Sequence, residues 1–142
     1  MAVQSVRMSL RGYYADGRKV TSDVFVAPLN LTEGDRITEI VCDRGAWHSA
    51  LLVFSQRRIS QYGAESEPHE ALASQIRTDL EYLAEWLQRH EPELSRLKAT
   101  GLKLDVFFDL WIDQDQLELA IPPALLLICG RLGLSIEMIT ND

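Results

Sequence analysis

Three aspartates recur at every fourth position, as Asp105, Asp109 and Asp113. Carboxylates bind divalent cations, and pairs of them catalyse glycoside hydrolysis. On a β-strand, residues four apart are separated by about 13 Å, at roughly 3.3 Å per residue. The ligands of one cation lie only about 2.0 to 2.6 Å from it, and the carboxylates of inverting glycosidases are roughly 6.5 to 9.5 Å apart. The row alone therefore predicts neither a metal site nor a catalytic pair.

Other chemical motifs fail on spacing. The turn that begins at Asp113 starts like a calcium loop, but it lacks the glycine at the sixth position and the glutamate at the twelfth. The histidines, His48, His69 and His90, include no pair with the spacing of a local zinc site. The glycines form no dinucleotide-binding or P-loop pattern. The sequence thus predicts no catalytic residues, no metal site and no cofactor.

An enzyme or small-molecule-binding domain is the alternative that these residues leave open. His48 follows Trp47 on a predicted strand and is the best candidate for lining a cleft, with Cys42 as a possible second member. Either cysteine could meet a histidine in space and act as a nucleophile. The simpler prediction is that Cys42 and Cys129 are free thiols that pack as small hydrophobic side chains.

The remaining indication of function is a pair of aromatic residues on one predicted strand. Phe107 and Trp111 share one face of a predicted strand with the aspartates. Burial of that whole face would bury carboxylates at high cost, whereas an open face would expose two rings among acids, as in protein-binding surfaces. The alternative is that a long helix covers the rings and leaves the aspartates at the rim. The predicted protein-binding surface comprises Asp105, Phe107, Asp109, Trp111 and Asp113.

The first part of the chain is predicted to be rich in strands. Ser5 to Tyr14 alternates loosely, and the following Asp16-Gly17 predicts a hairpin whose second strand is Lys19 to Ala27. In the alternative, Ser22-Asp23 caps a one-turn helix that ends near Pro28. Further strands are predicted at 36–42 and 47–59; the second contains an apolar run, which indicates burial on both faces.

Helical periodicity is clearest at residues 69–90, where apolar residues recur every three or four positions. Pro92 predicts a kink or restart, and Gly101 predicts the end of that helix. Residues 102–112 and 117–121 are predicted to pair as a hairpin. A helix from Pro122-Pro123 to Leu132 is apolar nearly all round and is expected to be buried, and a last strand follows. The apolar stripe of the long helix is Leu72, Ile76, Leu80, Leu83 and Leu87.

From Trp47 onward the predicted order is β-α-β-β-α-β, the ferredoxin-like order. The fold class is therefore predicted to be α+β, in one domain spanning residues 1–142. Residues 46–142 form the predicted α+β core. Residues 1–45 are predicted to add a β-hairpin or a strand and a helix to it.

Charge is distributed unevenly along the 142 residues, whose net charge is −7. Residues 1–63 hold 8 Lys and Arg against 6 Asp and Glu, whereas residues 64–142 hold 6 against 15. Such an acidic half disfavours nucleic acid and favours a basic protein partner. The basic side chains of the first half, Arg57 and Arg58 among them, are expected to pair with the acidic half. With neither a signal sequence nor a membrane span apparent, a cytoplasmic location is expected.

The residues from about Ile59 to Ile139 resemble a bacterial family, the domain-of-unknown-function family 4279. The likeness lies in the break at Glu91-Pro92, in Leu97-Lys98-Ala99-Thr100-Gly101-Leu102 leading into a strand, and in the helix that begins Pro123-Ala124-Leu125-Leu126 and ends Arg131-Leu132-Gly133-Leu134. The resemblance implies a small bacterial cytoplasmic domain. It carries over no activity and no catalytic residues.

Together these observations favour a non-enzymatic domain that binds another, basic protein, such as an immunity-type protein that neutralises a basic toxin. The second hypothesis is the small-molecule-binding domain or enzyme with a cleft near His48. The third is a homodimer joined through an exposed sheet edge.

Overall fold

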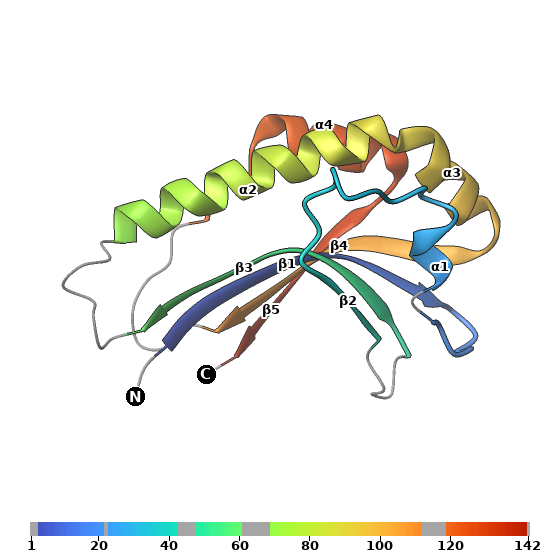
Figure 1. The fold of residues 1–142 in the computed structure, drawn as a ribbon, viewed down its shortest axis with the longest axis horizontal. Helices are drawn as coiled ribbons and strands as arrows, with labels where there is room; N and C mark the ends of the chain where they lie inside the picture. Colours follow the sequence, from blue (N-terminus) through green and yellow to red (C-terminus); the bar gives the residue numbers. More distant parts are fainter. Residues whose placement is uncertain (1–2, 22, 43–47, 61–68, 112–118, 142) are drawn as a thin grey trace.

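The computed structural model describes residues 3–21, 23–42, 48–60, 69–111 and 119–141, and its class is α+β, as predicted (Figure 1). The elements, in chain order, are β1 (Val3–Tyr14), α1 (Asp23–Val26), β2 (Glu39–Cys42), β3 (Ala50–Ser60), α2 (His69–Arg89), α3 (Glu91–Ala99), β4 (Leu102–Trp111), α4 (Pro123–Leu132) and β5 (Ser135–Asn141).

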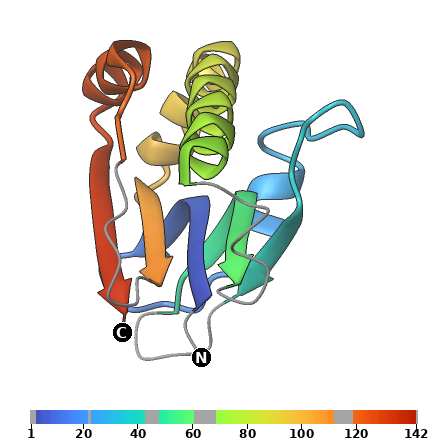
Figure 2. The same ribbon diagram turned by 90° about the vertical axis from the view of Figure 1, so that its left-hand side faces the viewer.

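One five-stranded sheet has the order β2-β3-β1-β4-β5. The central strand β1 is antiparallel to both β3 and β4, and β5 is parallel to β4. Figure 2 shows α2, α3 and α4 on the same side of this sheet, so the molecule has two layers. No helix among the described residues is both long and apolar enough to span a membrane.

The predicted ferredoxin-like topology is wrong, because the strand order differs from it. Residues 119–121, the described part of the expected return strand, are not in a strand. The place beside β4 that a hairpin partner would take is occupied by β1 on one side and β5 on the other. The N-terminal strand is thus the centre of the sheet rather than an addition to a separate core.

The predicted N-terminal hairpin is also absent, since residues 18–21 are not in a strand and residues 23–26 form the one-turn helix α1 of the alternative prediction. Both edges of β1 are already paired, so a hairpin partner has no edge to join. Phe25 of α1 is fully buried and lies against Gly12 of β1, where an added Cβ would be 3.0 Å from the Phe25 ring.

The core lies between the sheet and the helices. The predicted stripe of α2 is confirmed at Ile76, Leu80, Leu83 and Leu87, all buried together with Trp86; the side chain of Leu72 lies outside the described residues. The expected restart at Pro92 is confirmed by α3, and Gly101, with φ +99°, follows its end.

Complete burial of α4 was a wrong prediction. Leu126 and Leu127 are 53% and 65% exposed, because α4 covers the outer part of the sheet and has one side facing outward (Figure 2). The buried side chains of α4 are Leu125, Ile128, Cys129 and Leu132.

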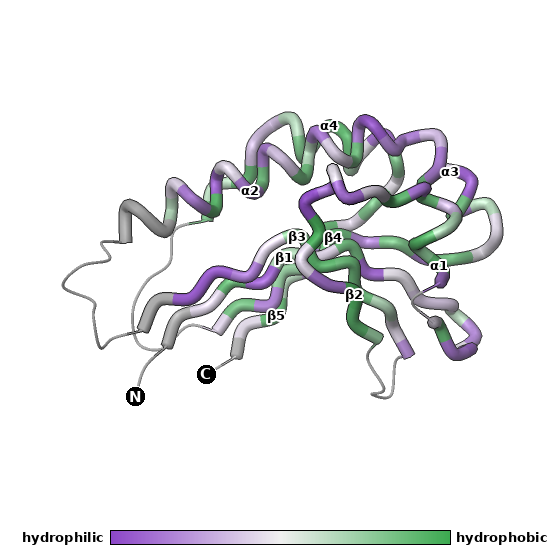
Figure 3. The backbone as a smooth tube through the Cα atoms, viewed as in Figure 1, coloured by the Kyte–Doolittle hydropathy of each residue, from purple (hydrophilic) through white to green (hydrophobic). Residues whose placement is uncertain are grey.

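A β-bulge bends the sheet. The pairing of β1 with β3 shifts between Met8 and Ser9, which pair with Ser55 and Val53. Such a bulge bends and twists its strand, and Figure 1 shows β1 and β3 arched, with the convex side toward the helices. Figure 3 shows hydrophilic and hydrophobic residues alternating along the strands, as expected for two different faces.

Candidate functional site

The sheet face opposite α2, α3 and α4 carries no described helix and is called the free face below (Figure 2). It contains most of the predicted binding surface, because alternate residues of β4 point to it. Strand register adds side chains from β1, β3 and β5 in rows across the sheet. The free face includes the side chains of Ser5, Arg7, Arg11, Glu39, Leu51, Val53, Arg58, Lys103, Asp105, Phe107, Asp109, Trp111, Glu137 and Ile139.

Arg11 and Asp105 form a close ion pair on the free face. The Arg11 Nη2 lies 2.6 Å from the Asp105 Oδ2, and its Nε lies 3.0 Å from Oδ1. Asp105 is only 3% exposed. Burial raises the pKa of the Asp105 carboxyl above its ordinary value; Arg11 opposes this rise, and Glu137 adds to it.

Arg7 and Asp109 make a second pair in the same strand register, with Nη2 and Oδ2 3.1 Å apart. The predicted pairing of N-terminal arginines with C-terminal acids is thus confirmed here, and again by Arg57 with Asp79 of α2 at 2.9 Å. Asp105 and Asp109 are therefore not an open acidic patch. Charged residues of the described free face balance, with Arg7, Arg11, Arg58 and Lys103 against Glu39, Asp105, Asp109 and Glu137.

The two aromatic rings that β4 places on the free face differ in exposure. Phe107 is 7% exposed: it packs with Leu51 and Val53, and the Arg11 guanidinium carbon lies 4.4 Å from its ring centroid. The expected exposure of Phe107 is therefore wrong, and so is the alternative of cover by the long helix, because the cover comes from the concave free face itself. Trp111 is 47% exposed, as expected. Asp113 lies outside the described residues.

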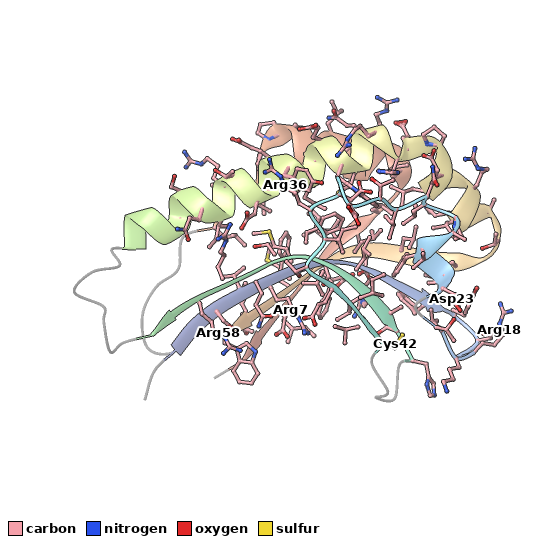
Figure 4. All side chains as sticks on the ribbon, in the orientation of Figure 1. Arg7, Arg18, Asp23, Arg36, Cys42 and Arg58 are labelled. Carbon is pink, nitrogen blue, oxygen red and sulfur yellow. The ribbon has the colours of Figure 1, made fainter. Side chains whose placement is uncertain are left out.

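Trp111 lies in one row with Ser5 and Arg58. Ser5 of β1 pairs with Trp111 on one side and with Arg58 of β3 on the other. Ser5 is small and buried, whereas Trp111 and Arg58 are exposed. Figure 4 shows Arg58 and Arg7 on the side of the sheet away from the helices. This row therefore presents an indole and a guanidinium on either side of a short residue.

Sequence analysis missed a second polar cluster, on the helix side. The buried Asp35 carboxylate accepts hydrogen bonds from the Trp86 Nε1 at 2.9 Å and the Thr32 backbone N–H at 2.8 Å, and His90 Nε2 lies 3.6 Å away. Burial alone would raise the pKa of Asp35, but these hydrogen bonds and His90 lower it overall. No local signal links residues about fifty positions apart.

This cluster attaches a loop to α2. The backbone N–H of Arg36 also donates to the Tyr82 hydroxyl at 2.8 Å, and Figure 4 shows Arg36 beside that helix. The Asp35 side chain is only 5% exposed, and its carboxylate already accepts hydrogen bonds from Thr32 and Trp86. The arrangement therefore holds the loop in place and leaves little room for a ligand.

The described residues give the cleft hypothesis little support. His48 is half-buried with φ +42°, and a hollow beside α2, lined by Ala73, Ile76, Arg77 and Ala120, contains neither His48 nor Cys42. Among the described residues, no three His, Cys, Asp or Glu side chains group as metal ligands. Both cysteines are free, as predicted, but Cys42 is exposed rather than packed (Figure 4).

Comparison of this chain with protein-family models, curated proteins and solved structures found no match.

Proposed function

We propose that this domain binds another protein through the free face of its sheet, with Trp111 as the central contact. The observation that carries the proposal is an indole 47% exposed on a strand held in the interior of the sheet. Tryptophan and arginine are enriched among the residues that dominate binding energies, and Arg58 lies in the same row as Trp111.

Two arginines of the free face are already fixed by ion pairs. Arg7 and Arg11 are held by Asp109 and Asp105, so a partner would immobilise few further long side chains. Less conformational entropy is then lost on binding, which favours affinity. A rigid face with balanced charges fits a partner that presents both acidic and basic groups.

A basic partner is the narrower form of this proposal. Its support is the net charge of −7, which attracts basic proteins at long range. The paired Asp105 and Asp109 add little to that attraction. Neutralisation of a basic toxin would therefore depend on the overall field of the protein rather than on these two carboxylates.

Site-specific photo-cross-linking tests the proposal. A photoreactive amino acid replaces Arg58 on the free face or Val26 on α1, which is 45% exposed, in cells of the source organism. We expect one protein to cross-link from position 58 and not from position 26. With that protein purified, Trp111→Ala should weaken binding by about 30-fold, the loss typical of a dominant interface residue, whereas Val26→Ala should leave it unchanged.

Two results would contradict the proposal. One is a set of cross-links that is the same from both positions. The other is a purified complex whose dissociation constant is unaffected by Trp111→Ala, because the indole would then lie outside the contact.

A further inference from the structure

The two edge strands of the sheet differ in how well they are protected. β2 is four residues long, and short edge strands offer little to another chain. β5 has seven residues and pairs with β4 without interruption from Asp105↔Ser135 to Trp111↔Asn141. Its sequence contains no proline, lysine or arginine, and Glu137 is its one charged residue. β5 therefore lacks most of the features that keep edge strands from pairing.

Exposed apolar side chains gather at this same edge. Of the six large exposed ones among the described residues, all but Val26 belong to the end of β4, to α4 or to β5. Met138 and Ile139 are each 46% exposed, and they point to opposite faces of the sheet because they are adjacent in a strand. The five side chains are Trp111, Leu126, Leu127, Met138 and Ile139.

We infer that two copies of this chain associate through β5, which pairs antiparallel with β5 of the second copy to form one continuous ten-stranded sheet. Residues Ser135–Asn141 are centred on Met138. An antiparallel pairing about Met138 therefore engages the whole strand and has the twofold symmetry of an isologous dimer.

The charge of β5 fits this register. With Met138 opposite its own copy, each Glu137 lies opposite Ile139 of the other chain, so the two carboxylates do not face each other. A pairing centred on Glu137 would oppose them. A stable interface buries about 800 Å² per partner, more than one strand supplies. Trp111, which pairs with Asn141 at the end of β5, and α4, which lies over this side of the sheet, would extend the contact.

This inference does not depend on the proposed function. The dimer uses the edge of the sheet, whereas the partner of the proposed function lies on the free face, and Trp111 borders both. Either can fail alone: a monomer could still cross-link a partner from position 58, and a dimer could have no further partner.

Sedimentation of the full chain over a range of concentrations tests the association. We expect a species of about twice the 16.1 kDa of one chain. Met138→Lys and Ile139→Glu should each weaken the dimer by roughly tenfold or more, because the first places two cations opposite each other on the twofold axis and the second places a carboxylate opposite Glu137 of the other chain. Val26→Lys changes an equally exposed apolar residue on α1 and should not alter the dimer.

Disulfide trapping tests the register. Directly opposite side chains have Cβ atoms about 4.5 to 5.5 Å apart, so Met138→Cys in a Cys42→Ser background should give a disulfide-linked dimer on mild oxidation. In the same background, Ser135→Cys should not, because the two introduced thiols would be about 20 Å apart along the strands. The native Cys129 is buried, and burial raises its thiol pKa to about 11, so it competes poorly.

A monomer at every concentration would overturn the inference. So would a dimer that withstands both Met138→Lys and Ile139→Glu in folded protein, checked by circular dichroism, or one that links equally well through positions 135 and 138.

Discussion

Arg11 and Asp105 are 94 residues apart in the chain and directly opposite each other in the sheet, where two nitrogens of the guanidinium contact both carboxylate oxygens. The pair also places the Arg11 guanidinium over Phe107, so one arginine covers both an acid and a ring on a face without a described helix.

Arg11→Leu should lower the free energy of unfolding at pH 7 by roughly 3 kcal/mol, because it leaves Asp105 buried without its cation. Urea denaturation measures the loss. The control is Arg18→Leu, which breaks the exposed pair of Arg18 with Asp16 and should lower the free energy of unfolding far less, because water screens that pair. Equal losses for the two variants would show that burial of the Arg11 pair is energetically unimportant.

The pH dependence of stability should carry the signature of Asp105. Its pKa is raised in the folded protein, so between about pH 4 and that raised pKa the folded chain holds more protons than the unfolded chain. Asp105 therefore makes the protein lose stability as pH rises through this interval. Asp105→Asn should flatten that slope in thermal melts, and an unchanged slope would assign the effect to another group.

Asp35 should have the opposite effect on the pH dependence of stability. Its pKa is lowered on folding, so its contribution to stability is present above about pH 4 and is lost as pH falls through the folded pKa. Asp35→Ala should cost about 1 to 3 kcal/mol at pH 7 in urea denaturation, because the buried Trp86 N–H loses its acceptor. Asp35→Asn keeps an acceptor and should cost less; a loss as large as that of alanine would contradict this role.

Two glycines near the end of α4 should respond oppositely to alanine. Gly133 has φ +67°, and a Cβ there would lie 2.8 Å from Lys98 Nζ, which donates to the carbonyls of Leu132 and Gly133. Gly133→Ala should therefore lower the free energy of unfolding by about 1 to 2 kcal/mol, because a residue with a Cβ is strained at this positive φ. Gly130 lies within the helix, and an added Cβ there would meet open space. Gly130→Ala should therefore raise the free energy of unfolding, by at most about 1 kcal/mol. Thermal melts that shift both variants in one direction would refute this reading of the turn.

The two thiols should react at very different rates. Cys42 is exposed, whereas Cys129 is buried with a pKa raised to about 11. A thiol reagent at pH 8 should modify one cysteine per native chain quickly, and the second only after denaturation. In Cys42→Ser the fast phase should vanish, and a fast phase that persists would mean that Cys129 is accessible.

Local patterns located most elements of this protein but not their neighbours in space. The stripe of α2, the restart at Pro92 and the end of α4 at Gly133 depend on residues within one or two turns, and all three are present. The Asp16-Gly17 pair does form a turn, with the Gly17 N–H bonded to the Tyr14 carbonyl, yet no strand follows it. A turn signal cannot show that both edges of the preceding strand are taken.

The same limit applies to the candidate surface. Because side chains alternate between the two faces of a strand, the sequence correctly predicted that Asp105, Phe107 and Trp111 share one face of β4. Their exposure depends on which strand lies beside β4, and the sequence does not reveal that Arg7 and Arg11 of β1 occupy that place. Long-range pairing thus changed a predicted acidic patch into a charge-balanced face.

The central position of β1 has a consequence for the order of assembly. Its partners begin at Ala50 and Leu102, so β1 is synthesised before either of them. Until β3 and β4 have been synthesised, neither edge of β1 has its partner in the sheet, whereas α2 and α3 can form from local contacts. A truncated chain without it would leave β2–β3 and β4–β5 as two separate ribbons, with no backbone hydrogen bonds joining them.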